Sequence, residues 1–298
     1  MPRRPKTNHN TTPKTTRTTT PDARPKTTTS ETPLPTKSVR SEDLREQILA
    51  DFATFQVPLR PEALDIVLAQ AEQEGLSYLA FLHRLVIDQA AERRDRGIAS
   101  RVREAHFRES QTLATFDWQF NAKSIDRSRI ESLATGEFIR RRQNLIIVGQ
   151  SGLGKSHIIQ AVGHQACSQG WRVRYTTSAE LLEQLRASMA DQTLPSCLRK
   201  YARYDLLIID EFGFDRLERQ ESPQAASLLY KVIDARSQLR STALITNIDF
   251  KAWAEYLGDA PLAMALTDRM VDGAIIIRIT GQSYRAHRAQ TEKPPKGK

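Results

Sequence analysis

The sequence has 298 residues, a net charge of +9 at pH 7 and a mean hydropathy of −0.50. No run approaches the ~18 apolar residues that a membrane-spanning helix needs, and the N-terminus lacks the apolar stretch of a secretory signal. With only Cys167 and Cys197, the chain has too few cysteines for a disulfide framework, so we expect a cytoplasmic protein that does not enter membranes.

The first 40 residues differ in composition from the rest. They hold thirteen Thr, seven Pro and nine Lys or Arg against two acidic residues. Such a segment cannot bury enough apolar surface to offset its ordering entropy, so we expect a disordered basic tail over 1–40. A second basic tail is expected over 286–298. Tails of this kind attract nucleic-acid phosphates without sequence preference.

Helical periodicity begins at Ser41. Apolar residues recur at helical spacing from Leu44, from Leu64 and from Phe81, which predicts a small helical domain over 41–110. We expect this domain to be the one that binds DNA or a partner. Its last part is rich in arginine: Arg93, Arg94, Arg96, Arg101, Arg103 and Arg108. Interleaved acidic residues fit a solvated face with i,i+4 ion pairs, and a helix lying along a DNA backbone fits equally well. The sequence leaves both interpretations open.

A connector over 111–138 leads to the second domain. Phe116, Trp118 and Phe120 stand at every second position, which predicts an extended segment whose aromatic side chains pack on that domain. Beyond it, short apolar runs alternate with helical patterns. Strands are expected near 144–148, 171–177, 206–210, 242–246 and 274–279, and helices near 155–168, 179–190, 195–203, 223–239 and 260–270. This alternation predicts an α/β domain over 139–285, a parallel sheet of P-loop type with helices on both faces.

The first strand runs into Gly-Gln-Ser-Gly-Leu-Gly-Lys-Ser at 149–156, a full match to the P-loop pattern G-x-x-x-x-G-K-[ST]. Glycines let successive backbone N–H groups point at a phosphate. Lys155 adds a positive charge near the β- and γ-phosphates, and the Ser156 hydroxyl can ligate Mg²⁺. The loop predicts binding of ATP with Mg²⁺. The candidate nucleotide-binding residues are Gly149, Gln150, Ser151, Gly152, Leu153, Gly154, Lys155, Ser156 and His157.

Polar residues end two later strands. Asp210 and Glu211 close the apolar strand from Leu206, a Walker B arrangement in which Asp210 would hold Mg²⁺ and Glu211 would orient or deprotonate the attacking water. Asn247 follows the fourth strand, whose C-terminal end should face the γ-phosphate. We therefore expect Asn247 to sense the phosphate and to position the water.

Two arginines complete the candidate site. Arg269 follows Asp268 in a helix, and it is either a surface arginine or a finger that reaches a neighbouring subunit's γ-phosphate. Arg285 is a third candidate phosphate sensor. If Arg269 is such a finger, the candidate catalytic residues are Glu211, Lys155, Asn247 and Arg269.

The order of these motifs resembles the AAA+ ATPases. More narrowly, the chain is similar to the IstB-type transposition helper ATPases, relatives of the DnaC helicase loaders. The similarity runs from about Leu44 to Arg285 and includes 75–82 (Gly-Leu-Ser-Tyr-Leu-Ala-Phe-Leu), 204–214 and 281–285 (Gly-Gln-Ser-Tyr-Arg). Ser156 stands where the family more often has Thr, and the Thr/Pro/Lys tail is outside the family pattern. After Arg285 we expect no helical lid, as in these relatives.

The resemblance implies an ATP-dependent homo-oligomer with ATP sites at its subunit interfaces. It would hydrolyse ATP, bind duplex DNA and recruit the transposase of the same insertion sequence, and so serve DNA recombination. Arg269 would act in trans. A DnaC-like replicative helicase loader is the alternative, because the ATPase motifs are shared. A small-molecule P-loop kinase fits the Asp-Glu and Asn pattern less well.

Overall fold

The computed structural model describes residues 41–57, 59–214 and 224–291. The expected tail over 1–40 lies outside these ranges. Two compact units are present, residues 1–56 and 57–298. The described part of the first is helix α1 (Ser41–Thr54), which has no buried residue.

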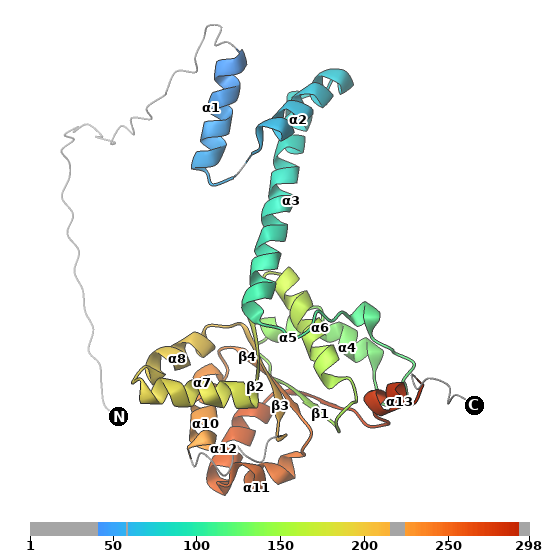
Figure 1. Cartoon of the computed structure of the whole chain (residues 1–298), viewed down its shortest axis with the longest axis vertical. Helices are drawn as coiled ribbons and strands as arrows, with labels where there is room; N and C mark the ends of the chain where they lie inside the picture. The colour runs from blue at the N-terminus through green and yellow to red at the C-terminus, as the bar shows by residue number, and fades with distance from the viewer. Residues whose placement is uncertain (1–40, 58, 215–223, 292–298) are drawn as a thin grey trace, which may run out of the picture. The chain divides into compact units, whose positions relative to one another are not determined.

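A five-stranded sheet forms the centre of the α/β part. Its strands are β1 (Leu145–Val148), β2 (Val173–Thr177), β3 (Leu206–Phe212), β4 (Ser241–Thr246) and β5 (Ile275–Arg278). Their order is β2-β3-β4-β1-β5, and all neighbouring strands are parallel (Figure 1). The predicted parallel α/β sheet is thereby confirmed. Because β1, β3 and β4 are central, their carboxyl ends meet at one edge.

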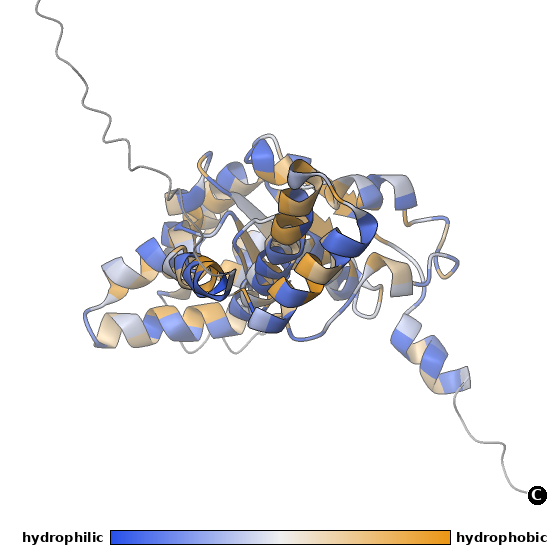
Figure 2. Cartoon of the chain, turned by 90° about the horizontal axis from the view of Figure 1, so that it is seen from above, coloured by the Kyte–Doolittle hydropathy of each residue, from blue (hydrophilic) through white to orange (hydrophobic). Residues whose placement is uncertain are grey.

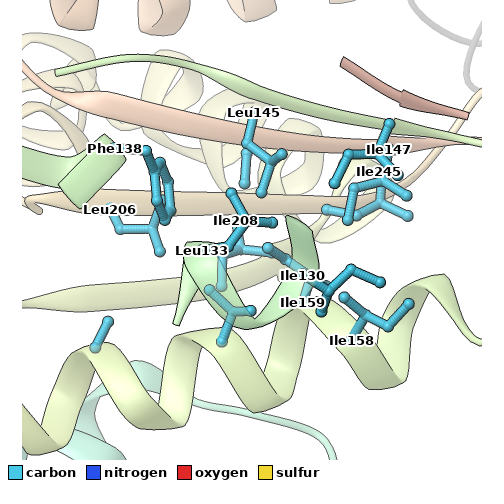
Figure 3. Close-up of a cluster of buried hydrophobic side chains, with 14 of the residues drawn as sticks. Ile130, Leu133, Phe138, Leu145, Ile147, Ile158, Ile159, Leu206, Ile208 and Ile245 are labelled. Atoms are coloured by element: carbon cyan, nitrogen blue, oxygen red, sulfur yellow. The ribbon is translucent and has the colours of Figure 1, made fainter. Parts of the chain in front are cut away.

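Helices cover both faces of the sheet. One face carries α4 (Arg127–Leu133), α5 (Glu137–Arg140) and α6 (Lys155–Ser168), whose apolar residues form one buried cluster with the strands (Figure 3). The opposite face carries α7 (Ser178–Ala190), α8 (Leu194–Ala202), α10 (Ala225–Arg236), α11 (Trp253–Leu257) and α12 (Ala260–Val271). Figure 2 shows hydrophilic and hydrophobic residues side by side along these helices. Each fully buried Leu or Ile contributes about 1.5–3 kcal/mol, so the two clusters hold the layers together.

Helices α2 (Pro61–Glu74) and α3 (Tyr78–Ala105) precede the sheet. Gly75 adopts φ 61°, which ends α2, and the Ser77 hydroxyl accepts a hydrogen bond from the Ala80 N–H at 3.3 Å, which begins α3. The C-terminal end of α3 packs on the α/β part, where Ala105 is fully buried. Within the described ranges, no helix is both long and apolar enough to cross a bilayer.

The connector is not extended, so that prediction was wrong. The Asp117 carboxylate accepts the N–H groups of Gln119 and Phe120, which turns the chain, and Asp126 caps α4 by accepting the Arg129 N–H. A 3₁₀ turn, η1 (Leu113–Thr115), lies before them. The aromatic side chains nevertheless pack on the sheet domain, as expected.

The sequence did not predict η1, α4 and α5 in the connector, and it did not predict three elements later in the chain. A second 3₁₀ turn, η2 (Phe250–Ala252), and helix α11 follow β4, and helix α13 (Tyr284–Thr291) follows β5. Helix α13 crosses position 285, where the sequence placed the end of the ATPase domain. Residues 286–291 are therefore helical, and the rest of the expected basic tail lies outside the described ranges.

A buried arginine joins α10 to the sheet. Arg236 is 1% exposed, and it donates to the carbonyl oxygens of Tyr201, Tyr204 and Ser241 and to the Thr242 hydroxyl. Burial lowers its pKa to about 9, which leaves the guanidinium protonated at neutral pH. All of these bonds come from one planar group, so no shorter side chain can replace it.

We expect Arg236→Met to lower the free energy of unfolding by about 3 kcal/mol or more, because four buried acceptors lose their donor. Urea unfolding followed by circular dichroism measures this loss. Arg240→Met is the matched control, because Arg240 is exposed and its pairing with Asp205 at 3.5 Å should contribute less than about 1 kcal/mol. Equal losses in the two variants would contradict a structural role for Arg236.

Candidate nucleotide-binding site

The loop between β1 and α6 has the backbone that phosphate binding requires. Gly152 and Gly154 adopt φ values of 80° and 82°, which side-chain-bearing residues rarely adopt. The neighbours also leave no room for a side chain. A Cβ on Gly154 would lie 2.8 Å from Phe116, and one on Gly149 would lie 2.4 Å from the Ile279 carbonyl oxygen. Phe116 of the connector and Ile279, just after β5, therefore pack so closely on the loop that only glycine fits at these two positions.

Lys155 starts α6 and is 8% exposed. Its Nζ donates to the Gln150 carbonyl oxygen at 2.7 Å, so the side chain lies back across the loop. Burial lowers the pKa of Lys155; Asp210 opposes this effect, and Arg285 adds to it. A buried ammonium group next to another cation is stabilised by an anion, so this corner of the site favours a phosphate.

Asp210 lies at the end of β3 and is 2% exposed. Its Oδ2 accepts the Tyr175 hydroxyl at 2.8 Å, and its Oδ1 accepts the Glu211 N–H at 2.7 Å. Burial, and then the charge of Asp210, raise the pKa of Tyr175, so the phenol stays a donor. The carboxylate is thereby fixed in orientation with lone pairs left for a further ligand.

A β-bulge shapes the end of β3. The β3–β4 register shifts between Ile209 and Phe212, and Glu211 adopts φ 61°. An αL glutamate is uncommon, and such strain collects at functional sites. The bulge breaks the alternation of the strand, so that both Asp210 and Glu211 line the cavity beside the loop.

Asn247 follows β4 and carries an unsatisfied buried atom. Its Oδ1 has no hydrogen-bond partner within the described part of the chain. An unpaired buried amide oxygen costs about 1–3 kcal/mol, so a donor from a bound group would stabilise it. Asn247 lines the same cavity as Glu211.

One cavity of about 480 Å³ brings most of the predicted residues together. It is lined by Ser151, Gly152, Leu153, Gly154, Lys155, Ser156, His157, Asp210, Glu211, Asn247 and Arg285, among others. Gly149 and Gln150, the first two residues of the loop, are not among the residues that line the cavity, although the Gln150 carbonyl oxygen accepts the hydrogen bond from Lys155. The His157 ring nitrogen lies 2.9 Å from the Thr112 carbonyl oxygen, so its ring is held by the connector.

Arg285 reaches the cavity through a clamp that the sequence did not reveal. The Asn121 amide donates to the Gln282 carbonyl oxygen at 2.8 Å and accepts the Gln282 N–H at 3.0 Å. The Tyr284 N–H then donates to the Gly152 carbonyl oxygen at 2.8 Å. These bonds attach the start of α13 to the P-loop, which places Arg285 beside Lys155.

Arg269 is not part of this cavity. It lies at the end of α12, where Nε donates to Asp234 at 3.2 Å and Nη1 donates to Asp268 at 3.2 Å. The hydrogen bond that Arg269 donates to Asp234 raises the pKa of Arg269. The guanidinium is about half-exposed, and within one subunit it has no contact with the nucleotide site. Its role stays a prediction.

The residues of the cavity fit a nucleoside triphosphate with Mg²⁺. The glycine backbone of the loop, the start of α6, Lys155 and Arg285 suit the phosphates. The Ser156 hydroxyl and the Asp210 carboxylate are oxygen donors of the kind that Mg²⁺ prefers. The unpaired Asn247 oxygen suits a water or hydroxyl donor. Tyr175, which the sequence reasoning missed, could have been found from its place on β2, the parallel neighbour of β3.

Comparisons with known proteins agree with this chemistry. Over residues 50–292 the chain matches the family model described as IstB-like ATP binding protein. The ATP-binding protein of insertion sequence IS5376 from Geobacillus stearothermophilus is 32% identical over 253 residues, which cover 84% of this chain and 98% of that protein. The ATP-binding protein of insertion sequence IS21 from Pseudomonas aeruginosa is 32% identical over 222 residues, which cover 74% and 82%.

A solved structure is also similar. The AMPPCP-bound DnaA of Aquifex aeolicus superposes with a TM-score of 0.47 at 17% identity, covering 63% of this chain and 56% of that chain.

Proposed function

This chain belongs to the family of IstB-like ATP-binding proteins, and we propose that it is an ATP-hydrolysing, DNA-binding helper of insertion-sequence transposition. One observation carries the hydrolysis: the P-loop, Asp210, Glu211 and Asn247 line a single cavity. The relatives are named as ATP-binding proteins of insertion sequences, which supports ATP as the nucleotide and a transposase as the partner.

In this mechanism, each residue has a separate task. The P-loop backbone and Lys155 hold the phosphates. Ser156 and Asp210 would hold Mg²⁺, which would supply positive charge beside the phosphates. Tyr175 keeps Asp210 in orientation. Asn247 orients a water near the γ-phosphate, and Glu211 accepts its proton as the water oxygen attacks the γ-phosphorus. The bond from this phosphorus to the β–γ bridging oxygen breaks, and ADP leaves.

We also propose that the protein acts as an oligomer. Arg269 lies outside the cavity of its own subunit, and an exposed arginine can serve a neighbour's γ-phosphate. In such an assembly ATP would lie at each interface, and ATP would promote assembly. Size-exclusion chromatography with light scattering, with and without ATP·Mg, tests this directly. A strictly monomeric protein at saturating ATP·Mg and DNA would rule the oligomer out.

A basic cleft beside edge strand β2 supports duplex DNA as the ligand. It has a volume of about 160 Å³ and is lined by Arg101, Glu104, Arg172, Val173, Lys200, Arg203 and Tyr204. Next to it on β2, Arg174 is 8% exposed, and its Nε has no hydrogen-bond partner among the described residues. The pKa of His106 is lowered by burial and then by the charges of Arg174 and Lys200, as expected in a positive field. We assign the cleft to DNA phosphates.

Two arginines of α3 have different surroundings. Arg96 pairs with Glu92 at 3.2 Å on the helix surface, which is the solvated-face interpretation. Arg101 is different, because its Nε donates to the Cys167 carbonyl oxygen at 2.8 Å and it lines the cleft. Arg101 therefore places the C-terminal end of α3 at the proposed DNA surface. That residues 41–110 form a domain that binds DNA or a partner stays a proposal.

Reversing two charges in the cleft tests the DNA surface. We expect Lys200→Glu with Arg203→Glu to weaken duplex binding by about tenfold or more at moderate salt, and to lower the slope of log K against log salt by about two. Fluorescence anisotropy measures both quantities. Lys231→Glu with Lys251→Glu is the matched control, because it changes net charge equally at exposed sites outside the cleft. If both double variants bind alike, the cleft is not the contact surface.

A further inference from the structure

The segment that follows α3 lies along α6 and is anchored at two points. Phe107 stacks on His164 with ring centroids 4.1 Å apart, and Gly163 makes room for it, because a Cβ there would lie 2.7 Å from the Phe107 ring. Two residues later, the Glu109 N–H donates to Gln160 Oε1 at 3.0 Å. The backbone on each side of Arg108 is therefore fixed against the helix that carries the P-loop.

Arg108 extends from this segment to the other wall of the cavity. Its Nη1 donates to Glu211 Oε1 at 3.1 Å, and its Nη2 donates to Glu180 Oε1 at 3.0 Å. Glu180 is itself fixed, since its carboxylate accepts the Thr177 N–H in the capping box of α7. One guanidinium thus ties the proposed general base to a rigid helix start.

This contact has a chemical consequence for Glu211. The guanidinium occupies Oε1 of Glu211, and a lone pair that already accepts a hydrogen bond cannot accept a proton from water. Arg108 also donates to Glu180, so the guanidinium bridges the two carboxylates and keeps Glu211 on the side of Glu180. The pair is half-exposed, which makes it weak enough to break when the arginine moves.

We propose that Arg108 is a positioning residue that restrains Glu211 in the resting subunit, and that displacement of α3 by bound DNA releases it. The inference rests on the proposed function, in which Glu211 is the base and the end of α3 belongs to the DNA surface. Arg108 stands three residues after the end of α3. Arg101, which lines the cleft, is bonded to α6 through Cys167. A displacement of the helix end that breaks the contacts of Arg101, Phe107 and Glu109 with α6 would also draw Arg108 away from Glu211.

Steady-state kinetics of Arg108→Ala test the restraint. We expect the DNA-free kcat to rise about fivefold with an unchanged KM for ATP, and stimulation by duplex DNA to fall by the same factor, because the substitution removes a half-exposed ion pair. Arg108→Lys, which keeps the charge but cannot bridge both carboxylates in a fixed geometry, should lie between wild type and Arg108→Ala. Arg141→Ala is the control, since it removes another exposed arginine–glutamate pair, to Glu137.

The remaining outcomes overturn the restraint. An unchanged or lower DNA-free kcat means that Arg108 orients Glu211 productively or only supports the fold. A raised KM with unchanged kcat means that Arg108 binds the phosphates. Glu211→Gln, measured in parallel, separates the two proposals: if it hydrolyses ATP at the wild-type rate, the proposed function fails. If it is inactive while Arg108→Ala behaves as wild type, only the restraint fails.

Discussion

Glu211→Gln is expected to lower kcat for ATP hydrolysis by about 10²–10³-fold while the affinity for ATP stays close to that of the wild type. Glutamine keeps the length and the hydrogen-bonding capacity of the side chain but cannot accept a proton. The Glu211 N–H bond to Asp210 belongs to the backbone, so the substitution leaves the proposed Mg²⁺ ligand in place. The loss should therefore fall on turnover and not on binding.

The strained backbone does not complicate this variant. Glutamine and glutamate face the same cost at φ 61°, since neither is branched at Cβ. Glutamine also still accepts from Arg108. A coupled assay for ADP release gives kcat, and a fluorescent ATP analogue gives the dissociation constant. Glu183→Gln, an exposed position on α7, controls for the loss of one acidic charge. A variant with more than a tenth of wild-type turnover would show that Glu211 is not the base.

Much of this site could be read from local sequence. The P-loop, the strand that ends in Asp210 and the strand before Asn247 are each continuous segments, and parallel pairing brings their carboxyl ends together without further information. The expected strands therefore lie within two residues of their observed bounds. The sheet with helices on both faces followed from the alternation alone.

The parts that sequence did not reveal depend on contacts between distant residues. Arg108 meets Glu211 across 103 positions, and Asn121 meets Gln282 across 161. The sequence marks Arg108 only as one of the arginines of a basic stretch, without its contact with Glu211, and Asn121 belongs to no motif. The bulge at Glu211 is a third case, because a glutamate with positive φ has no signature of the kind that glycine gives. The alternation of aromatic residues predicted an extended connector, and this prediction was wrong. The carboxylates of Asp117 and Asp126 accept N–H groups two or three residues later in the chain, and these hydrogen bonds turn the backbone.

Arg269→Ala is expected to abolish turnover, by about 10³-fold or more, with nucleotide binding nearly intact, as for an arginine supplied to a neighbour's phosphate. Within its own subunit, Arg269 lines no part of the nucleotide cavity, and its partners are the exposed Asp234 and Asp268. A strong effect on hydrolysis from this position would therefore favour action across an interface. Arg127→Ala, which removes an exposed pair to Glu131, should leave turnover unchanged.

Mixing two inactive variants distinguishes a finger from a structural arginine. Subunits with Glu211→Gln keep Arg269, and subunits with Arg269→Ala keep Glu211. If ATP lies between neighbours, a mixed assembly contains complete sites wherever an Arg269→Ala subunit binds ATP beside a Glu211→Gln subunit. Random mixing in equal amounts creates such a pairing at about one interface in four. Hydrolysis should then return to a measurable fraction of the wild-type rate. No recovery, in mixtures that assemble as the wild type does, would mean that Arg269 acts within its own subunit or only supports the fold.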